Sequence, residues 1–526
     1  MDDWSNFEKY LFRSDELGIT IDFSKIGFSE KFFNGMAEKI AVAYQEMAAL
    51  EAGAVANRDE NRMVGHYWLR NSNIAPSSEI QVNIDKGIEK ILKFAEQVHL
   101  GSLAGQDGKF ENALLIGIGG SALGPQLLCD SLDGDNKINC YFIDNTDPDG
   151  IDLILKKLEG RLGQTLVIVT SKSGSTPEPR NAMVEVMAAY EKNKYTFSRH
   201  AVAITGQDSL LDKQAHSEGW IGRFPMWEWV GGRTSVFSAV GLLPAALQGI
   251  SIKSFLAGAR DMDTMTRVDS FKNPAMTMAL AWYCATDGVG KKDMVVIPYK
   301  DRLSNFAKYL QQLIMESLGK EKDRDGHIVH QGLTVYGNKG STDQHSFIQQ
   351  LRDGLQNFFI TIISVLKSRN GISPAVDSNG MTSGDYLNGF ALGTAKALNE
   401  NGTGVIQISI DKFSEYELGA LIALYERAVG FYASMVNINA YHQPGVEAGK
   451  KAAAEILQIQ RSIGSFLEKN KGKKLTIDAI ADGINLKNQK ALVFKLLEHM
   501  AANGNGIKRN PSPEILTSTF FTKSEK

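Results

Sequence analysis

The stretch Leu114–Pro125 reads LLIGIGGSALGP, an apolar run that enters a glycine-rich turn and continues into a helical pattern. Gly117, Gly119 and Ala122 fit the GxGxxG/A spacing of a strand–turn–helix unit. Such a unit can hold a dinucleotide, or a single phosphate at the N-terminus of its helix. The stretch therefore predicts an α/β fold and leaves the ligand open.

Six more apolar segments rich in β-branched residues are each followed by turn residues and a helical stretch. This alternation predicts right-handed βαβ units with strands buried in parallel sheets. NCYFID, TLVIVT and AVAITG follow the opening stretch, whereas DMVVIPY, FFITIISV and GVIQISI lie beyond residue 290. The sequence therefore predicts two α/β domains.

We expect four parts along the chain. Residues 1–108 have a mainly helical pattern and are expected to pack on the core. Residues 109–270 and 271–464 are expected to form the first and the second α/β domain. Residues 465–526 turn polar, and two short helical patterns with a turn between them predict a helix-turn-helix-like or winged appendage.

Composition limits the classes of protein. The 526 residues are 43% hydrophobic and carry a formal net charge of -3, so no basic surface for nucleic acid is expected. The three cysteines form no CxxC pair, so neither a disulfide framework nor a zinc knuckle is suggested, and a reducing compartment fits. No signal peptide and no apolar run of about 20 residues is visible. We expect a cytoplasmic protein without a membrane partner, or a stromal or similar protein made with a transit segment.

One hypothesis for the glycine loop is a nicotinamide-dependent dehydrogenase. Asp144 ends the next apolar run, 27 positions after Gly117, where such enzymes place an acid for the ribose. The motif alone is weak, because the glycines can also serve only a tight turn. No proton-relay histidine or substrate arginine has the spacing of that class.

A second loop favours a phosphate. TLVIVTSKSGSTPEPRNAM (Thr165–Met183) again predicts a strand, a turn and a helix start. Its turn crowds donor side chains into six positions: Ser171, Lys172, Ser173, Ser175 and Thr176. A terminal phosphate takes several donors, whereas a helix N-cap at Thr176 followed by Pro177 explains only one or two hydroxyls.

Four further residues stand in stretches with catalytic potential. Arg233 follows two glycines, Glu316 lies on an otherwise apolar helix, His345 follows a loop with glycine and serine, and Lys450 lies in the first turns of a helix. Each is ordinary alone. Together they supply a base, an acid/base histidine and two cations in a chain that also carries a phosphate loop.

These stretches resemble the phosphoglucose isomerase family. The matching blocks run in order from Gly117 to Ala453: GIGGSALGP, SKSGSTPEPRNAM, GGRTSVFSAVGLLP, QQLIMESLGK, STDQHSFIQQLRDG and QPGVEAGKKAA. The resemblance implies two sugar-isomerase (SIS) three-layer αβα sandwich domains with parallel-sheet cores, and interconversion of glucose 6-phosphate and fructose 6-phosphate. It also implies a homodimer with sites shared across the interface, and neither a metal nor another cofactor.

The resemblance also implies roles for individual residues. Glu316 matches the base that moves a proton between C1 and C2, and Arg233 matches the arginine near the enediolate oxygens. His345 and Lys450 match the pair that opens the sugar ring, and Gln312 matches a substrate-binding position. The substrate phosphate is expected to contact Gly120, Ser121, Ser171, Lys172, Ser173 and Thr176. The SKSGSTPEP loop departs from many relatives, which carry threonines, a bulky residue or glutamine there.

The chemistry agrees with these roles. Aldose–ketose exchange without a metal needs a base with a pKa near the working pH, which suits a partly buried glutamate. A fixed guanidinium stabilises the charge of the enediolate, and a histidine can protonate the ring oxygen. A different class, a phosphosugar-sensing regulator, would use the helix-turn-helix-like segment and would not need Glu316, His345 and Lys450 together.

Overall fold

The computed structural model describes residues 3–134, 138–270, 272–504, 506–512, 514 and 517–522. The chain forms two compact units, Met1–His442 and Gln443–Lys526. No helix among the described residues is long and apolar enough to cross a membrane. The predicted boundary at residue 464 falls inside the continuous helix α15 (Pro444–Lys469), so the helix that carries Lys450 belongs to the C-terminal unit.

The first sheet is entirely parallel and has the order β4-β3-β5-β6-β7. Its strands are β3 (Asn112–Ile116), β4 (Asn139–Ile143), β5 (Thr165–Thr170), β6 (Ala201–Thr205) and β7 (Gly222–Pro225). The predicted strands in ALLIGI, NCYFID, TLVIVT and AVAITG are therefore confirmed. Edge strand β7, which contains a glycine and a proline, was not predicted.

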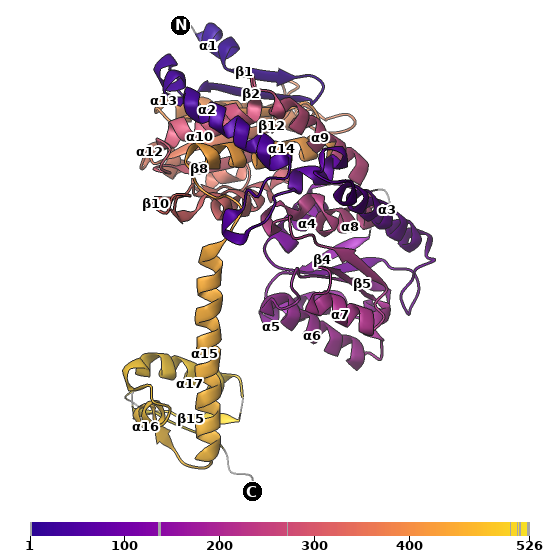
Figure 1. Ribbon diagram of the computed structural model, residues 1–526, viewed down its shortest axis with the longest axis vertical. Helices are drawn as coiled ribbons and strands as arrows, with labels where there is room; N and C mark the ends of the chain where they lie inside the picture. The colour runs from indigo at the N-terminus through magenta and orange to yellow at the C-terminus, as the bar shows by residue number, and fades with distance from the viewer. Residues whose placement is uncertain are drawn as a thin grey trace. The chain divides into compact units, whose positions relative to one another are not determined.

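Helices cover both faces of this sheet, because alternate residues of each strand point to opposite sides. In β3, Leu114 and Ile116 join the core beneath α5 (Pro148–Lys157), α6 (Pro177–Lys192) and α7 (Leu210–Ser217). Ala113 and Leu115 join the main core on the other face. That core includes residues of α3 (Ser78–Leu100) and α8 (Ala239–Gln248), and α4 (Gly120–Ser131) packs on α8 (Figure 1).

The second sheet is mixed, with the order β1-β2-β13-β12-β8-β11. Its parallel part confirms the strands predicted in DMVVIPY, FFITIISV and GVIQISI: β8 (Asp293–Tyr299), β12 (Phe358–Val365) and β13 (Val405–Ile410), joined by β11 (Val335–Tyr336). The N-terminal segment adds β1 (Leu11–Ser14) and β2 (Ile19–Lys25), both antiparallel. The expectation of a mainly helical N-terminal segment left out this hairpin, whose partner β13 lies far along the chain.

A helical layer lies against both sheets and shares the main core with them. It contains α2 (Glu30–Glu51), α9 (Ile252–Arg267), α10 (Pro274–Thr286) and the fully buried face of α14 (Glu415–Met435). Helices α12 (Ile348–Asp353) and α13 (Ser383–Glu400) contribute to the core on the other face of the second sheet. Arg70, Asp263 and Arg427 form ion pairs inside the helical layer with fully buried side chains.

The C-terminal unit has a core of its own, drawn from residues 463–520. Besides α15 it contains α16 (Ile477–Gly483), α17 (Lys490–Ala502) and an antiparallel sheet in the order β14-β16-β15. Those strands are β14 (Leu475–Thr476), β15 (Ile507–Asn510) and β16 (Thr519–Thr522). Figure 1 shows these elements gathered around the end of α15 in yellow.

Candidate active site

The two glycine- and serine-rich loops leave the same edge of the first sheet. Strands β3 and β5 are parallel neighbours, with Ile116 opposite Val169, so the residues that follow both strands emerge side by side. The first loop leads into α4 and the second into α6. Helix N-termini carry N–H groups without partners inside the helix, so this edge suits an anion.

The second loop is organised by its own hydroxyls. Ser171 Oγ accepts from the Gly174 N–H at 3.1 Å, and Ser173 Oγ lies 2.8 Å from Ser175 Oγ. Ser171 is buried, and Ser173 and Ser175 are exposed. Thr176 is the N-cap of α6, but its side chain makes no capping hydrogen bond. Its hydroxyl is therefore available to a ligand.

The ammonium group of Lys172 has its partners outside this loop. Its Nζ donates to the carbonyls of Glu228 at 3.0 Å and Val230 at 3.1 Å, and lies 3.6 Å from the Glu228 carboxylate. Burial lowers the pKa of Lys172, while the Glu228 carboxylate raises it. Lys172 thus ties the phosphate loop to the segment that leads into Arg233.

The first loop meets two other elements closely. A Cβ built on Gly120 would lie 1.9 Å from the Gly232 carbonyl oxygen, and one on Gly119 would lie 3.1 Å from Gln312 Nε2. Gly119 has a φ of 58°, in the left-handed region that favours glycine. These glycines therefore bring the start of α4 against the segment of Arg233 and the helix of Gln312. Ser121, the second residue of α4, is half-buried.

Glu316 ends a π-helical stretch, Gln311–Glu316, that continues α11 (Phe306–Leu310). Such wide turns occur often at functional sites. Gln312 Nε2 donates to Glu316 Oε2 at 2.9 Å, and the Glu316 side chain is 19% exposed. The carboxylate is therefore held in place yet open to a ligand.

Arg233 is buried in the short helix η6 (Gly232–Phe237), and its guanidinium is fixed by backbone carbonyls. Nη1 donates to the Ala440 carbonyl at 3.0 Å and Nη2 to the His442 carbonyl at 3.2 Å. Nη2 also lies 3.4 Å from Glu316 Oε1. Burial lowers the pKa of Arg233, and the Glu316 carboxylate opposes that effect. The pair therefore holds a carboxylate and a guanidinium beside each other in fixed positions.

Lys320 completes this cluster and was missed by sequence reasoning. Its side chain is buried, and Nζ donates to the Glu316 carbonyl at 2.7 Å. Burial and the positive charge of Arg233 lower the pKa of Lys320 to about 7, although Glu316 and Asp59 raise it. The only signal in the sequence was its position four residues after Glu316.

His345 is the last residue of η9 (Thr342–His345) and is exposed. Among the described residues, no hydrogen bond or ion pair joins His345 to Arg233, Gln312 or Glu316. Lys450 is exposed on α15 in the C-terminal unit. The structure thus brings Gln312, Glu316 and Arg233 together and does not connect His345 to them by such a contact.

Asp144 is the acid that a nicotinamide enzyme would use to bind the ribose, but it has another partner in this structure. Asp144 Oδ2 accepts from Gln126 Nε2 of α4 at 2.8 Å. This bond fixes α4 against the end of β4, which gives Asp144 a structural role that needs no ribose. The structure therefore favours the phosphate interpretation of the opening stretch over the dinucleotide one.

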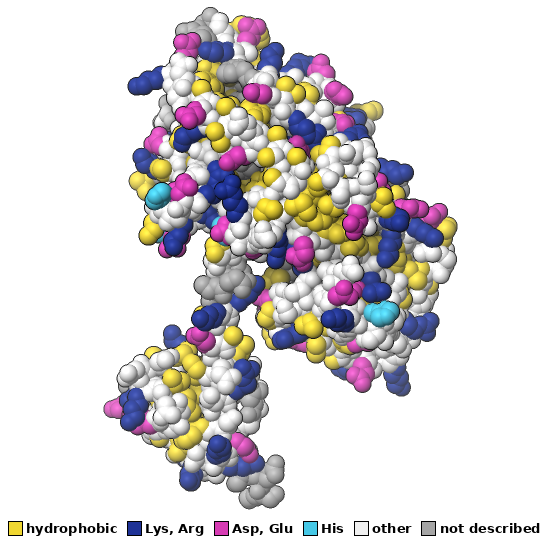
Figure 2. Space-filling model, in the orientation of Figure 1, with side chains coloured by type: hydrophobic (Ala, Val, Ile, Leu, Met, Phe, Trp, Pro, Cys, Tyr) yellow, Lys and Arg dark blue, Asp and Glu magenta, His cyan; other side chains and the backbone are white. Residues whose placement is uncertain are grey.

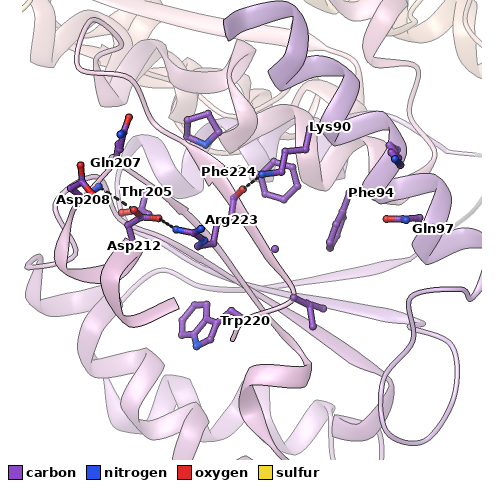
Figure 3. A pocket seen from close by; sticks show the side chains of 14 residues that line it. Lys90, Phe94, Gln97, Thr205, Gln207, Asp208, Asp212, Trp220, Arg223 and Phe224 are labelled. Atoms are coloured by element: carbon purple, nitrogen blue, oxygen red, sulfur yellow. Dashed lines mark hydrogen bonds and ion pairs between the residues drawn. The ribbon is translucent and has the colours of Figure 1, made fainter. Parts of the chain in front are cut away.

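A cavity of about 710 Å³ lies outside this cluster, between α3, α7 and strand β7 (Figure 3). None of the predicted site residues lines it. Two of its cations already have partners: Lys90 donates to the Arg223 carbonyl at 2.6 Å, and Arg223 pairs with Asp212 at 2.9 Å. We therefore base the site on the Arg233–Glu316 cluster.

Comparison with known proteins shows the family to which the chain belongs. The profile of the family described as phosphoglucose isomerase matches residues 22–470. A protein named glucose-6-phosphate isomerase from Geotalea daltonii is 54% identical over 503 residues, 95% of either chain. One of the same name from Trichormus variabilis is 53% identical over 507 residues, 96% of either chain.

Solved structures show the same architecture. A glucose-6-phosphate isomerase from Chlamydia trachomatis aligns with a TM-score of 0.77 at 25% identity, over 87% of this chain and 91% of that chain. A hypothetical protein from Thermus thermophilus aligns with a TM-score of 0.71 at 26% identity, over 84% of this chain and 99% of that chain. The layered α/β fold around two sheets is therefore shared with these proteins.

Proposed function

The chain belongs to the phosphoglucose isomerase family, and we propose that its active site is the Arg233–Glu316 cluster together with the loops that precede α4 and α6. The protein is an aldose–ketose isomerase that interconverts glucose 6-phosphate and fructose 6-phosphate. One observation carries the assignment of the site. A partly exposed carboxylate, fixed by Gln312 and Arg233, lies beside a glycine loop suited to phosphate.

Glu316 is the base of this proposal. Its carboxylate takes the proton from C2 of the open-chain aldose, which leaves a cis-enediol or enediolate, and returns a proton to C1 to give the ketose. The reverse reaction starts at C1 of the ketose. The hydrogen bond from Gln312 fixes the carboxylate and leaves Oε1 directed to Arg233. General base catalysis of this kind supplies about 10²–10⁴-fold in rate.

Arg233 stabilises the negative charge that develops on the enediolate oxygens. An arginine side chain stays protonated in proteins, and here two carbonyls already hold it, so little reorganisation is needed during the reaction. We assign Lys320 a positioning role, because its ammonium group holds the backbone carbonyl of the residue that carries the base.

The phosphate anchors the substrate away from the bonds that change. We propose that it accepts hydrogen bonds from Ser121, Ser171, Ser173 and Thr176 and from the Gly120 N–H at the start of α4. Lys172 adds positive charge nearby while it fixes the loop to the Glu228–Val230 segment. Binding energy from the phosphate orients the reacting end of the sugar.

Ring opening is assigned to His345 and Lys450 from the sequence blocks that contain them. An exposed His345 without a described contact to the cluster is compatible with a homodimer in which this residue serves the partner's site. We propose such a dimer. We also place the enzyme in the cytoplasm, because its three cysteines are unpaired, as in proteins of reducing compartments.

The experiment that tests this function follows the sugar directly. Purified protein is mixed with fructose 6-phosphate in EDTA, without nicotinamide, and the formation of glucose 6-phosphate is followed by NMR. We expect catalytic turnover to the equilibrium mixture. Turnover that requires an added metal or nicotinamide would contradict the proposed chemistry, and no turnover under any condition would contradict the activity.

A further inference from the structure

In its order of elements, the C-terminal unit resembles a winged helix-turn-helix, because two helices joined by residues 484–489 are followed by a β-hairpin. Helices α16 and α17 succeed each other after β14, and β15 and β16 then complete a sheet in which β16 is central. Buried residues of both helices share one core with α15, among them Ile480, Leu497 and Ile463. In DNA-binding proteins with a helix-turn-helix, the second helix lies in the major groove.

The proposed isomerase site draws on this unit only through Lys450 of α15 and does not account for α16, α17 and their sheet. The phosphoglucose isomerase profile ends at residue 470, before β14, α16 and α17 begin. Every residue of the Arg233–Glu316 cluster and both phosphate loops lie in the other unit. Helix α17 and the turn before it therefore need an explanation of their own.

The unit also differs in charge from the rest of the chain. Residues 465–526 contain 11 Lys and Arg against 6 Asp and Glu, a formal charge of +5, and the remainder of the chain carries -8. The near-neutral net charge of the whole chain hides this difference between its parts. The expectation of no nucleic-acid partner was based on that net charge. Figure 2 shows Lys and Arg side chains along the rim of the unit.

Helix α17 presents a polar face opposite its buried one. Val493, Leu496, Leu497 and Met500 are buried, whereas Lys495 and His499 are exposed one turn apart. The exposed residues at and just before the start of the helix are Lys487, Asn488, Gln489 and Lys490. The N-terminal residues of a recognition helix are those that reach base edges, and Lys, Asn and Gln have the required donors and acceptors.

Two acidic residues moderate the charge of this face. Asp482 lies 3.5 Å from Lys487, and Asp478 lies 2.7 Å from Lys490. Lys495 has no ion pair among the described residues. Exposed pairs of this kind contribute little free energy, so phosphates can replace the carboxylates as partners. The resulting affinity should be moderate and sensitive to salt.

The surface is a poor match for an apolar protein partner. Among the described residues of the unit, the exposed large hydrophobic side chains are Ile456 and Leu457, both on α15 before the residues of the core. Protein interfaces are enriched in aromatic residues and depleted of lysine at their centres. A lysine-bearing helix face with Asn and Gln suits a polyanion better.

We propose that α17 and the turn before it, residues 487–502, bind duplex DNA in the major groove, mainly through phosphate contacts of Lys487, Lys490 and Lys495. The binding is independent of the isomerase reaction. Three phosphate contacts correspond to a slope of about -3 in a plot of log affinity against log salt.

The test measures fluorescence anisotropy of a labelled 20-base-pair duplex with the full chain, at several salt concentrations. We expect a Kd of about 10⁻⁶–10⁻⁴ M near physiological salt, and tighter binding at lower salt. Lys487→Glu, Lys490→Glu and Lys495→Glu together should weaken binding at least tenfold. Asp478→Asn with Asp482→Asn should strengthen it severalfold, because the competing carboxylates are neutralised.

The control replaces three exposed lysines of the other unit, Lys31, Lys253 and Lys396, by glutamate. This variant has the same net charge as the first and should bind as the unsubstituted chain does. Isomerase turnover reports that the first unit of every variant is folded, and far-UV circular dichroism with thermal unfolding reports the same for the C-terminal unit, which has a core of its own. Equal loss in both triple variants, unchanged binding in the first, or equal affinity for a single strand of the same length would overturn the proposal.

Discussion

At the scale of single residues, the proposed site depends on three groups that hold Glu316 in place. Gln312 holds one carboxylate oxygen, Arg233 faces the other, and Lys320 fixes the carbonyl of the same residue. Arg233 is itself held by two carbonyls near residue 440. The proposed base is thus held through both its side chain and its backbone.

Lys320 provides a prediction for stability against pH. Its pKa of about 7 in the folded protein lies below its ordinary value of 10.5, so the unfolded chain binds more protons between these pH values. Stability therefore rises with pH in that window, and Lys320→Met removes this dependence. Denaturant unfolding measures the free energy of unfolding of both proteins. The value for the unsubstituted protein minus the value for Lys320→Met should rise by up to about 1.4 kcal/mol per pH unit.

The matched control for that measurement is Lys322→Met, two residues along β9 (Lys320–Lys322) and exposed. The difference in free energy of unfolding between the unsubstituted protein and Lys322→Met should not change with pH in this way. A difference for Lys320→Met that stays flat between about pH 7 and 10 would show that Lys320 is not desolvated as described.

Thr176 provides a prediction for substrate binding. A hydrogen bond to a charged group contributes about 1.5–3 kcal/mol, so Thr176→Val should lower kcat/KM about 10–100-fold, mostly through KM. Steady-state kinetics with fructose 6-phosphate measure the effect. Ser175→Ala, in the same loop but outside the proposed donors, is the control, and an equal effect of both substitutions would count against the donor assignment.

At the scale of elements, the site depends on the contact between α4 and η6. Gly120→Ala would place a methyl group 1.9 Å from the Gly232 carbonyl oxygen and push the two elements apart. We expect a loss of about 1–3 kcal/mol in stability and a loss of activity, since Arg233 follows Gly232. Thermal unfolding and turnover measure both effects.

Gly393→Ala on α13 is the matched control, because nothing lies within 4 Å of its added Cβ. A helix-interior alanine there should stabilise the protein by up to about 1 kcal/mol. If Gly120→Ala behaved like Gly393→Ala, the close approach of α4 and η6 would not be needed for the site.

The strands show which elements sequence patterns can predict and which they cannot. All seven apolar runs form the predicted strands, because buried parallel strands have a strong local signature. The β1–β2 hairpin was missed because its identity depends on pairing of Ile21 with Ile408, far along the chain. Strand β7 was missed because Gly222 and Pro225 leave it little β propensity.

The candidate site was predictable only in part for related reasons. The glycine and hydroxyl loops predict phosphate binding from residue type alone, and Glu316 and Arg233 lie in distinctive blocks. Lys320 precedes the charged run EKDRDGH, which is typical of an exposed turn, so nothing local indicates that its side chain is buried. Its burial arises from tertiary packing that no pattern in one sequence encodes.

At the scale of the whole molecule, the proposed dimer has active sites that combine residues of two chains. If His345 serves the partner's site, a mixture of inactive Glu316→Gln and inactive His345→Ala chains should recover activity after subunit exchange. One of the two sites in each mixed dimer then has both residues intact, so up to half of its sites can be active. Light scattering measures the dimer, and mixtures that stay inactive despite exchange would contradict shared sites.

Solvent exchange measures whether Glu316 carries the proton between C1 and C2. In deuterated water, NMR should show the unsubstituted enzyme incorporating deuterium at C2 of glucose 6-phosphate and C1 of fructose 6-phosphate. Glu316→Gln should bind fructose 6-phosphate with similar affinity and lose exchange by about 10²–10⁴-fold. Exchange at a near-normal rate in Glu316→Gln would contradict this role.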